Sequence, residues 1–312
     1  MKKISIILLV LMIVLATPLF AADQILRAGM WAEASNLRDI RTPSELDFTL
    51  NPYLYYEFGR PSADNFTAYG YVDAPYVIGD AFDTLWPAVG AGFNYRIHSS
   101  QDAIMNTGLS LASDKAETAG TYIDALGHFY WYPYNRATEV TVIPHFGDFV
   151  DGLRFGLGLE AGAVVENLLE DADIATIING ALAGRMVAGA QLSERFWLQT
   201  QLKLKVPAFV APSSFDTYGL HASGILDTSF GYYGDRLYLT TGLYGKLVAS
   251  NLFTQDGLLE GAAYQYDFNL WGELGFFVIE NLNVYAGAEF SGWRGVSDDS
   301  AVAYFGVEYY LL

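Results

Sequence analysis

The stretch RFWLQTQLKLKV, residues 195–206, alternates between apolar and polar side chains almost without interruption. Its even positions are nearly all apolar, whereas its odd positions are mostly glutamine and lysine. Only an extended β-strand has a period of two, so this segment has one apolar face and one polar face. Whether the apolar face contacts a protein core or lipid decides the fold class.

The same alternation recurs along most of the chain, in segments that are roughly 10 to 14 residues long. Strands of soluble proteins average ~5–6 residues, whereas a tilted strand that crosses a bilayer needs ~9–11. Strand length therefore favours a membrane-spanning sheet. Turn residues separate the segments, for example at Tyr134-Asn135, Gly234-Asp235 and Glu280-Asn281. We expect strands at 25–34, 46–58, 66–78, 87–98, 104–113, 121–132, 137–147, 152–165, 179–192, 195–206, 217–231, 236–249, 261–277, 282–292 and 301–312.

Charged residues fall repeatedly on the face opposite the large apolar side chains. A charge on a lipid-facing position at mid-membrane costs about 2–4 kcal/mol, so such segregation is expected if the apolar face meets hydrocarbon. The polar face then lines the interior of a closed barrel. The predicted lumen-lining residues are Arg96, Arg154, Glu160, Arg185, Lys203, Lys205, Asp227, Lys246, Asp267, Glu273 and Glu289.

Aromatic residues gather near the ends of several segments, where membrane barrels carry girdles of aromatic side chains at the two interfaces. We interpret them as such girdles, although tyrosine is also a good strand former in any sheet. The residues concerned are Tyr53, Tyr55, Tyr56, Tyr130, Trp131, Tyr132, Tyr134, Tyr232, Tyr233, Tyr309 and Tyr310.

The first 22 residues have the sequence features of a cleaved signal peptide. Lys2 and Lys3 precede an apolar run, which ends in small residues at Ala21 and Ala22. The remainder, residues 23–312, contains no linker and no low-complexity tract, and we expect it to form a single barrel domain. The absence of cysteine rules out disulfides and thiolate chemistry.

The chain is both apolar and acidic. Hydrophobic residues make up 52% of the 312 residues and charged residues only 17%, against a typical ~25% charged. The formal net charge is −18, which would repel phosphates, so nucleic acid is not an expected partner.

At this point the whole mature chain resembles the outer-membrane β-barrel class of diderm bacteria. The last segment, AVAYFGVEYYLL, is similar to the C-terminal strand that the barrel-assembly machinery recognises in that class, although it ends one residue beyond the usual aromatic. The resemblance implies an all-β, closed antiparallel transmembrane barrel in the outer membrane, with outer-membrane lipid and the assembly machinery as partners. An even strand count is required, and we expect about 14, within a range of roughly 12 to 16, with 25–34 outside the wall.

A porin-like passive channel for small solutes, with a polar charged lumen, is the function that we expect. A closed structural or surface-interaction barrel is the alternative, and a soluble secreted β-sandwich is the alternative fold. No enzyme is expected, because the four histidines all fall on the inward face and no catalytic signature accompanies them; they are His98, His128, His145 and His221. The acidic run at 170–173 does not match a calcium loop, so no metal and no cofactor are expected.

Overall fold

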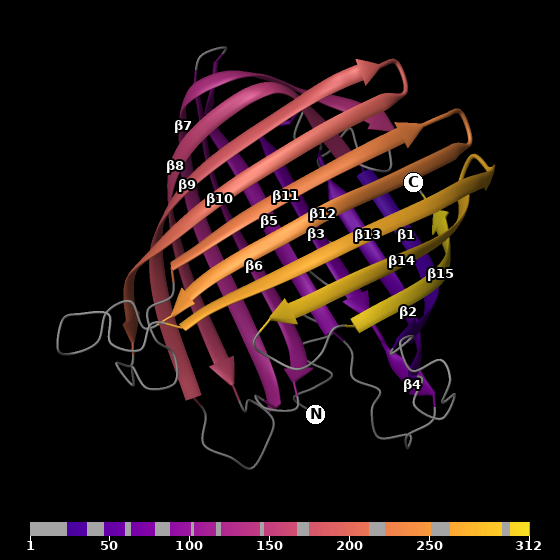
Figure 1. The fold of residues 1–312 in the computed structure, drawn as a ribbon, viewed down its shortest axis with the longest axis horizontal. Coiled ribbons are helices and arrows are strands. Elements are labelled where there is room, and N and C mark those ends of the chain that lie inside the picture. The colour runs from indigo at the N-terminus through magenta and orange to yellow at the C-terminus, as the bar shows by residue number, and fades with distance from the viewer. Residues whose placement is uncertain are drawn as a thin grey trace.

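Figure 1 shows the fold of the computed structural model. The structure describes residues 24–35, 47–59, 64–78, 88–100, 103–116, 120–143, 147–166, 175–211, 222–250, 263–294 and 300–311. The predicted signal peptide and its boundary at residue 22 lie outside these ranges. In the part of the chain that is described, no helix is long and apolar enough to cross a membrane.

Antiparallel β-strands make up the described chain. They are β1 (Gln24–Ser35), β2 (Asp47–Phe58), β3 (Phe66–Asp73), β4 (Tyr76–Ile78), β5 (Ala88–Ser99), β6 (Ile104–Ala116), β7 (Gly120–Ile143), β8 (Gly147–Glu166), β9 (Ala175–Ser193), β10 (Phe196–Ala211), β11 (Ala222–Tyr233), β12 (Leu237–Ser250), β13 (Ala263–Ile279), β14 (Leu282–Arg294) and β15 (Ser300–Tyr310).

The sheet closes on itself, because β1 is hydrogen-bonded to both β2 and β15. Strands β3 and β4 both pair with β2 and occupy one position in the wall. Ala74 and Pro75 interrupt them, and proline cannot donate a ladder hydrogen bond. The wall therefore has 14 strand positions, which confirms the predicted closed antiparallel barrel and its strand number.

Two of the predicted assignments were nevertheless wrong, and their errors cancel in the count. Segment 25–34 belongs to the wall as β1, whereas 121–132 and residues 137–143 of the next predicted segment are parts of one strand, β7. The predicted turn at Tyr134-Asn135 is a bulge, since the register with β8 shifts between Trp131 and Tyr134. Pro133 lies in this bulge, which tolerates a residue that lacks an amide proton and mimics a turn in the sequence.

The connections at the two ends of the barrel differ in length. The end that holds both Gln24 and Tyr310 has short connections, such as 194–195 and 280–281. The opposite end has longer ones, such as 212–221 and 251–262. This is the asymmetry that transmembrane barrels have.

The predicted faces are confirmed. On β8, Leu157 is 52% exposed on the outer surface, whereas Arg154 faces inward and is buried. On β10, Leu204 is 53% exposed, whereas Trp197 faces inward and is 3% exposed. The barrel thus has an apolar exterior and a polar and aromatic interior.

Many tyrosines that the sequence placed in interfacial girdles point into the barrel instead. Trp131, Tyr134 and Tyr309 are exposed on the outside, as a girdle requires. Tyr53 and Tyr130, in contrast, lie flat against the wall over a glycine of the neighbouring strand, and so does Tyr238, which was not assigned to a girdle. Their directly opposed register partners are Gly29, Gly158 and Gly275. Mid-strand glycines in this barrel thus make room for inward-facing rings, and the rings cover the exposed glycine backbone.

The β7–β8 hairpin leaves the wall and folds over the short-turn end of the barrel (Figure 1). The pairing of β8 with β9 ends at Gly152, which has a φ of 108°. Such a φ is open to glycine and strained for other residues, so Gly152 allows the sharp turn inward. Beyond it, Val150 donates its amide hydrogen to the Gln199 side chain at 2.9 Å.

The part of this hairpin at Val140 and Phe149 packs on an aromatic core inside the lumen. The Phe149 ring lies 5.6 Å from that of Trp197 and 5.7 Å from that of Tyr233. Val140 packs against the same core. The core residues come from β1, β10, β11, β12, β13 and β15, namely Ile25, Trp197, Tyr233, Tyr238, Phe277 and Tyr310. The hairpin therefore narrows the lumen at the end where Gln24 and Tyr310 lie.

An arginine should be far more harmful on the outer face than on the inner face. We expect Leu204→Arg to destabilise the barrel in lipid by about 2–4 kcal/mol. Ser229→Arg is the control, because Ser229 lines an inner cavity beside Asp227 and its charge would remain solvated. Urea unfolding in lipid vesicles, followed by gel mobility, measures both. Equal damage from the two variants would mean that the faces are assigned wrongly.

A methyl group should be tolerated at an open glycine and not beneath a ring. A Cβ at Gly275 would lie 2.1 Å from the Tyr238 ring, whereas one at Gly184 would meet no atom within 4 Å. We expect Gly275→Ala to cost about 1–3 kcal/mol through forced displacement of the ring. Gly184→Ala should change stability by less than about 0.5 kcal/mol. The same unfolding assay compares the two variants. An equal loss of unfolding free energy would contradict the role given to the contact between the glycine and the ring.

Candidate functional site

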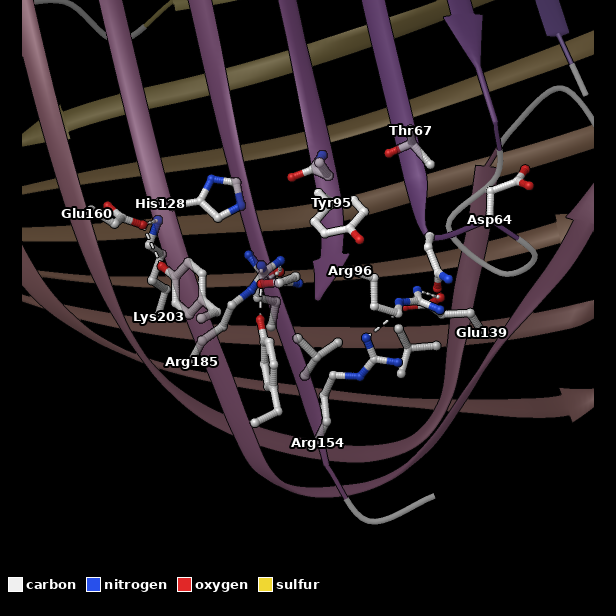
Figure 2. A pocket seen from close by; sticks show the side chains of 18 of the residues that line it. Asp64, Thr67, Tyr95, Arg96, His128, Glu139, Arg154, Glu160, Arg185 and Lys203 are labelled. Atoms are coloured by element: carbon white, nitrogen blue, oxygen red, sulfur yellow. Dashed lines mark hydrogen bonds and ion pairs between the residues drawn. The ribbon is translucent and has the colours of Figure 1, made fainter. Parts of the chain in front are cut away.

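A polar cavity of about 380 Å³ lies in the lumen beside the β7–β8 hairpin (Figure 2). Its lining comes from β3 and from β5 to β10, and the hairpin contributes Glu139 and Val150. The structure brings six of the predicted lumen residues together at or beside this cavity. They are Arg96, Arg154, Glu160, Arg185, Lys203 and Lys205.

Glu139 holds two arginines at one side of the cavity. One carboxylate oxygen lies 2.6 Å from the Arg96 guanidinium and the other lies 2.8 Å from that of Arg154. Since Glu139 is on the hairpin and Arg96 is on β5, this ion pair also ties the hairpin to the wall. Charge-assisted hydrogen bonds of this kind are among the stronger polar contacts in proteins.

Glu160 holds two lysines at the other side of the cavity. Its side chain is 3% exposed and forms ion pairs with Lys203 and with Lys205, the latter at 2.6 Å. Tyr130 donates its hydroxyl hydrogen to the same carboxylate at 2.5 Å. Adjacent inward positions on β10 therefore carry both ammonium groups to one buried carboxylate.

Arg185 has only neutral partners. Its guanidinium donates to the Gln201 side-chain oxygen and, at 3.3 Å, to the Tyr132 hydroxyl. It also lies 5.7 Å from the centre of the Tyr130 ring. Among the described residues, no carboxylate lies within ion-pair distance of Arg185. The cavity thus contains a cation that the protein does not neutralise.

Carboxylates on the other half of the lumen are held by neutral donors. Glu273 accepts from Tyr238 at 2.8 Å and from Tyr304 at 3.1 Å. Glu289 accepts from Asn269 at 2.5 Å. These residues lie on β12 to β15, so the lumen has a basic half on β5 to β10 and an acidic half facing it.

The remaining predicted lumen residues do not join the basic cluster. Asp227 lines a separate cavity with Ser229 and Thr240. Lys246 and Asp267 are register partners on β12 and β13. Together with Glu273 and Glu289, they lie on the strands from β11 to β14.

Sequence reasoning missed a cluster at the seam between the first and last strands. Glu308 of β15 forms an ion pair with Arg27 of β1 at 3.4 Å. It accepts hydrogen bonds from Tyr53 at 2.8 Å and from Tyr310 at 2.5 Å. The cluster borders a second cavity of about 400 Å³. Including 25–34 in the wall would have placed Arg27 on the inward face of β1, opposite Tyr310 and diagonal to Glu308 on β15.

Among the described residues, no group of three or more acidic or histidine side chains is arranged to hold a metal ion. His128 lines the basic cavity, whereas His145 and His221 lie outside the described residues.

No protein-family model matches the sequence, and no curated protein sequence matches it either. The fold is similar to that of several solved outer-membrane proteins. A loop-deletion mutant of OmpT of Vibrio cholerae aligns at 8% identity with a TM-score of 0.46, over 92% of this chain and 99% of that chain. The outer-membrane channel DcaP of Acinetobacter baumannii aligns at 9% identity with a TM-score of 0.44, over 93% and 98%. OpdQ of Pseudomonas aeruginosa aligns at 9% identity with a TM-score of 0.40, over 92% and 98%.

The shared carboxylate of Glu160 should matter far more than an exposed ion pair. Glu160→Gln leaves Lys203 and Lys205 close together without a counter-charge. We expect the free energy of unfolding to fall by about 2–4 kcal/mol. The loss should be smaller than for a fully buried ion pair, because both lysines are partly exposed. Asp235→Asn breaks the surface pair with Arg195, in which the aspartate is 91% exposed, and should cost less than about 1 kcal/mol. Urea unfolding of the two variants measures the difference, and similar losses would contradict the role given to Glu160.

Proposed function

We propose that this protein is a passive, non-enzymatic channel for small polar solutes in the outer membrane of a diderm bacterium, reached by signal-peptide-dependent export. The observation that carries the proposal is the distribution of side chains in the closed barrel. Large apolar residues are exposed around the outside, whereas charges, amides and tyrosine hydroxyls lie inside.

The exterior supports a membrane location. Soluble monomers rarely expose contiguous apolar patches beyond a few hundred Å², yet exposed leucines and phenylalanines occur here on strands from β2 to β15. A closed barrel leaves no unpaired sheet edge for hydrocarbon to contact. The short connections, Gln24 and Tyr310 then face the periplasm, and the assembly machinery would meet β15 there.

The interior supports passage of solutes. Cavities of about 380 and 400 Å³ lie in the lumen, and both are lined by charged and hydrogen-bonding groups. Rings of such groups select and conduct polar solutes in channels. The hairpin at the periplasmic end is held by side-chain contacts and by one backbone hydrogen bond to Gln199, so it can narrow the path without sealing it permanently.

The same hairpin favours a second candidate, a closed barrel that interacts through its external loops. Its part at Val140 and Phe149 packs on an aromatic core that fills the lumen at the short-turn end. In that case the cavities open only toward the outside and the barrel does not conduct.

Planar-bilayer conductance with a tethered hairpin separates the two candidates. A Val150→Cys/Gln199→Cys pair, joined by a short bifunctional thiol reagent with a cleavable link, fixes the hairpin to β10. The native chain has no cysteine, so only this pair reacts. We expect discrete conductance steps before tethering, a several-fold loss after it, and recovery on cleavage. The single Val150→Cys variant, treated identically, should not change.

A shortened hairpin supplies the complementary test. Thr138 and Asp151 are register partners, as are Ala137 and Gly152. Residues 138–151 can therefore be replaced by Asn-Gly, which suits a two-residue hairpin turn and leaves the wall pairing intact. We expect larger conductance steps from this variant. A folded barrel that conducts neither with the hairpin nor without it would establish the closed candidate.

A further inference from the structure

Around this cavity, the described basic side chains outnumber the described carboxylates. Arg96 and Arg154 share Glu139, Lys203 and Lys205 share Glu160, and Arg185 has only neutral partners among the described residues. Asp64 at the edge of the cavity is a third acid. Among the residues that the structure describes at the cavity, five bases therefore face three carboxylates. This concentration runs against the composition of the whole chain, whose net charge is −18.

Two guanidinium groups in this cavity have unused donor capacity. Arg185 makes no ion pair, as described above. Arg154 is a buried residue, and its Nε has no hydrogen-bond partner. Leaving such a donor unsatisfied is costly, so a buried unsatisfied nitrogen at a cavity indicates a position where an acceptor binds.

Much of the remaining lining offers hydrogen bonds, beside the aliphatic Leu126, Val150 and Val187. Thr67, Asn94, Asn106 and Gln199 contribute hydroxyl and amide groups to the same cavity. Figure 2 shows Glu160 with Lys203 and Arg185 on one side of it and Glu139 with Arg96 on the other. Its volume of about 380 Å³ is within the range of small-molecule sites, ~300–1,000 Å³.

We propose that this cavity binds a small organic carboxylate whose remaining groups are hydroxyls or amides. Arg185 is the principal anion-binding residue, because its planar guanidinium matches a carboxylate. The hydroxyl and amide side chains of the lining hold the rest of the molecule. The inference deepens the proposed function by naming the class of solute that the channel selects.

The side chains of the cavity already contain carboxylates that are bound by basic groups. Each internal carboxylate sits between two basic groups, Glu139 between Arg96 and Arg154 and Glu160 between two lysines. The excess charge matches one small anion rather than a polyphosphate. Carboxylate recognition by one guanidinium that has no counter-ion among the described residues is therefore favoured over recognition of phosphate, which takes more donors for its additional oxygens.

Calorimetric titration of the folded barrel in detergent tests the site without requiring conduction. Gluconate serves as the carboxylate probe, glucitol as the uncharged analogue of the same size, and inorganic phosphate as the competing anion. We expect gluconate to bind, and glucitol and phosphate to bind at least about tenfold more weakly, since a charge-assisted hydrogen bond contributes about one to two powers of ten in affinity.

Variants then locate the site. Arg185→Gln should weaken gluconate binding about tenfold to a hundredfold, and Arg185→Lys should recover part of it because an ammonium keeps the charge without the planar fork. Lys246→Gln is the matched control, which removes an inward-facing base outside the cluster, and it should leave binding unchanged. Heat-dependent gel mobility confirms that each variant is folded.

Three results would overturn the inference: no gluconate binding, tighter binding of phosphate than of gluconate, or an equal loss from Arg185→Gln and Lys246→Gln. The proposed function fails separately, through the absence of conductance. If the barrel binds gluconate through Arg185 but does not conduct, the proposed anion site is supported and the proposed channel function is contradicted.

Discussion

Closure of an apolar-surfaced ring is the constraint on which the rest of this structure depends. When β1 pairs with β15, no strand edge remains, and a charged side chain at mid-wall is stable only if it points inward. The interior then has to accommodate charges, amides and phenols within one barrel. The two sides of the lumen solve this differently, since arginine and lysine neutralise Glu139 and Glu160 on β7 and β8, whereas tyrosine hydroxyls and an amide hold Glu273 and Glu289 on β13 and β14.

Tyrosine and glycine are a matched pair in this solution. An inward ring that projected into the lumen would block it, but a ring laid over a glycine on the next strand stays against the wall. Tyr238 over Gly275 and Tyr130 over Gly158 place their hydroxyls beside Glu273 and Glu160 in this way. The aromatic content of the chain thus contributes to wall packing and to polar satisfaction together.

Most of the wall could be predicted from the sequence, because alternation is a local property and each strand face is visible within a dozen residues. The faces of β8 and β10 follow from it, whereas the number of strand positions was predicted correctly only because two errors cancelled. What failed was non-local. The membership of β1 depends on its pairing with residues nearly three hundred positions away, and the 24-residue length of β7 was hidden by a bulge at Pro133. In the sequence, only Gly152 marks the place where the β7–β8 hairpin folds inward. A glycine within a strand can equally indicate a bulge or the close approach of another group, so it does not predict this fold. The basic cluster likewise needed three-dimensional neighbours, since its members are spread over five strands.

The docked hairpin also has a consequence for assembly. Its part at Val140 and Phe149 contacts a core formed by residues of β10 to β13 together with Ile25 of β1 and Tyr310 of β15. That surface is incomplete until the first and last strands meet, so the hairpin docks after the ring has closed. The same two strands are bridged elsewhere by Arg27, Tyr53 and Glu308. Docking of the hairpin and closure of the ring therefore share one core, so that each stabilises the other.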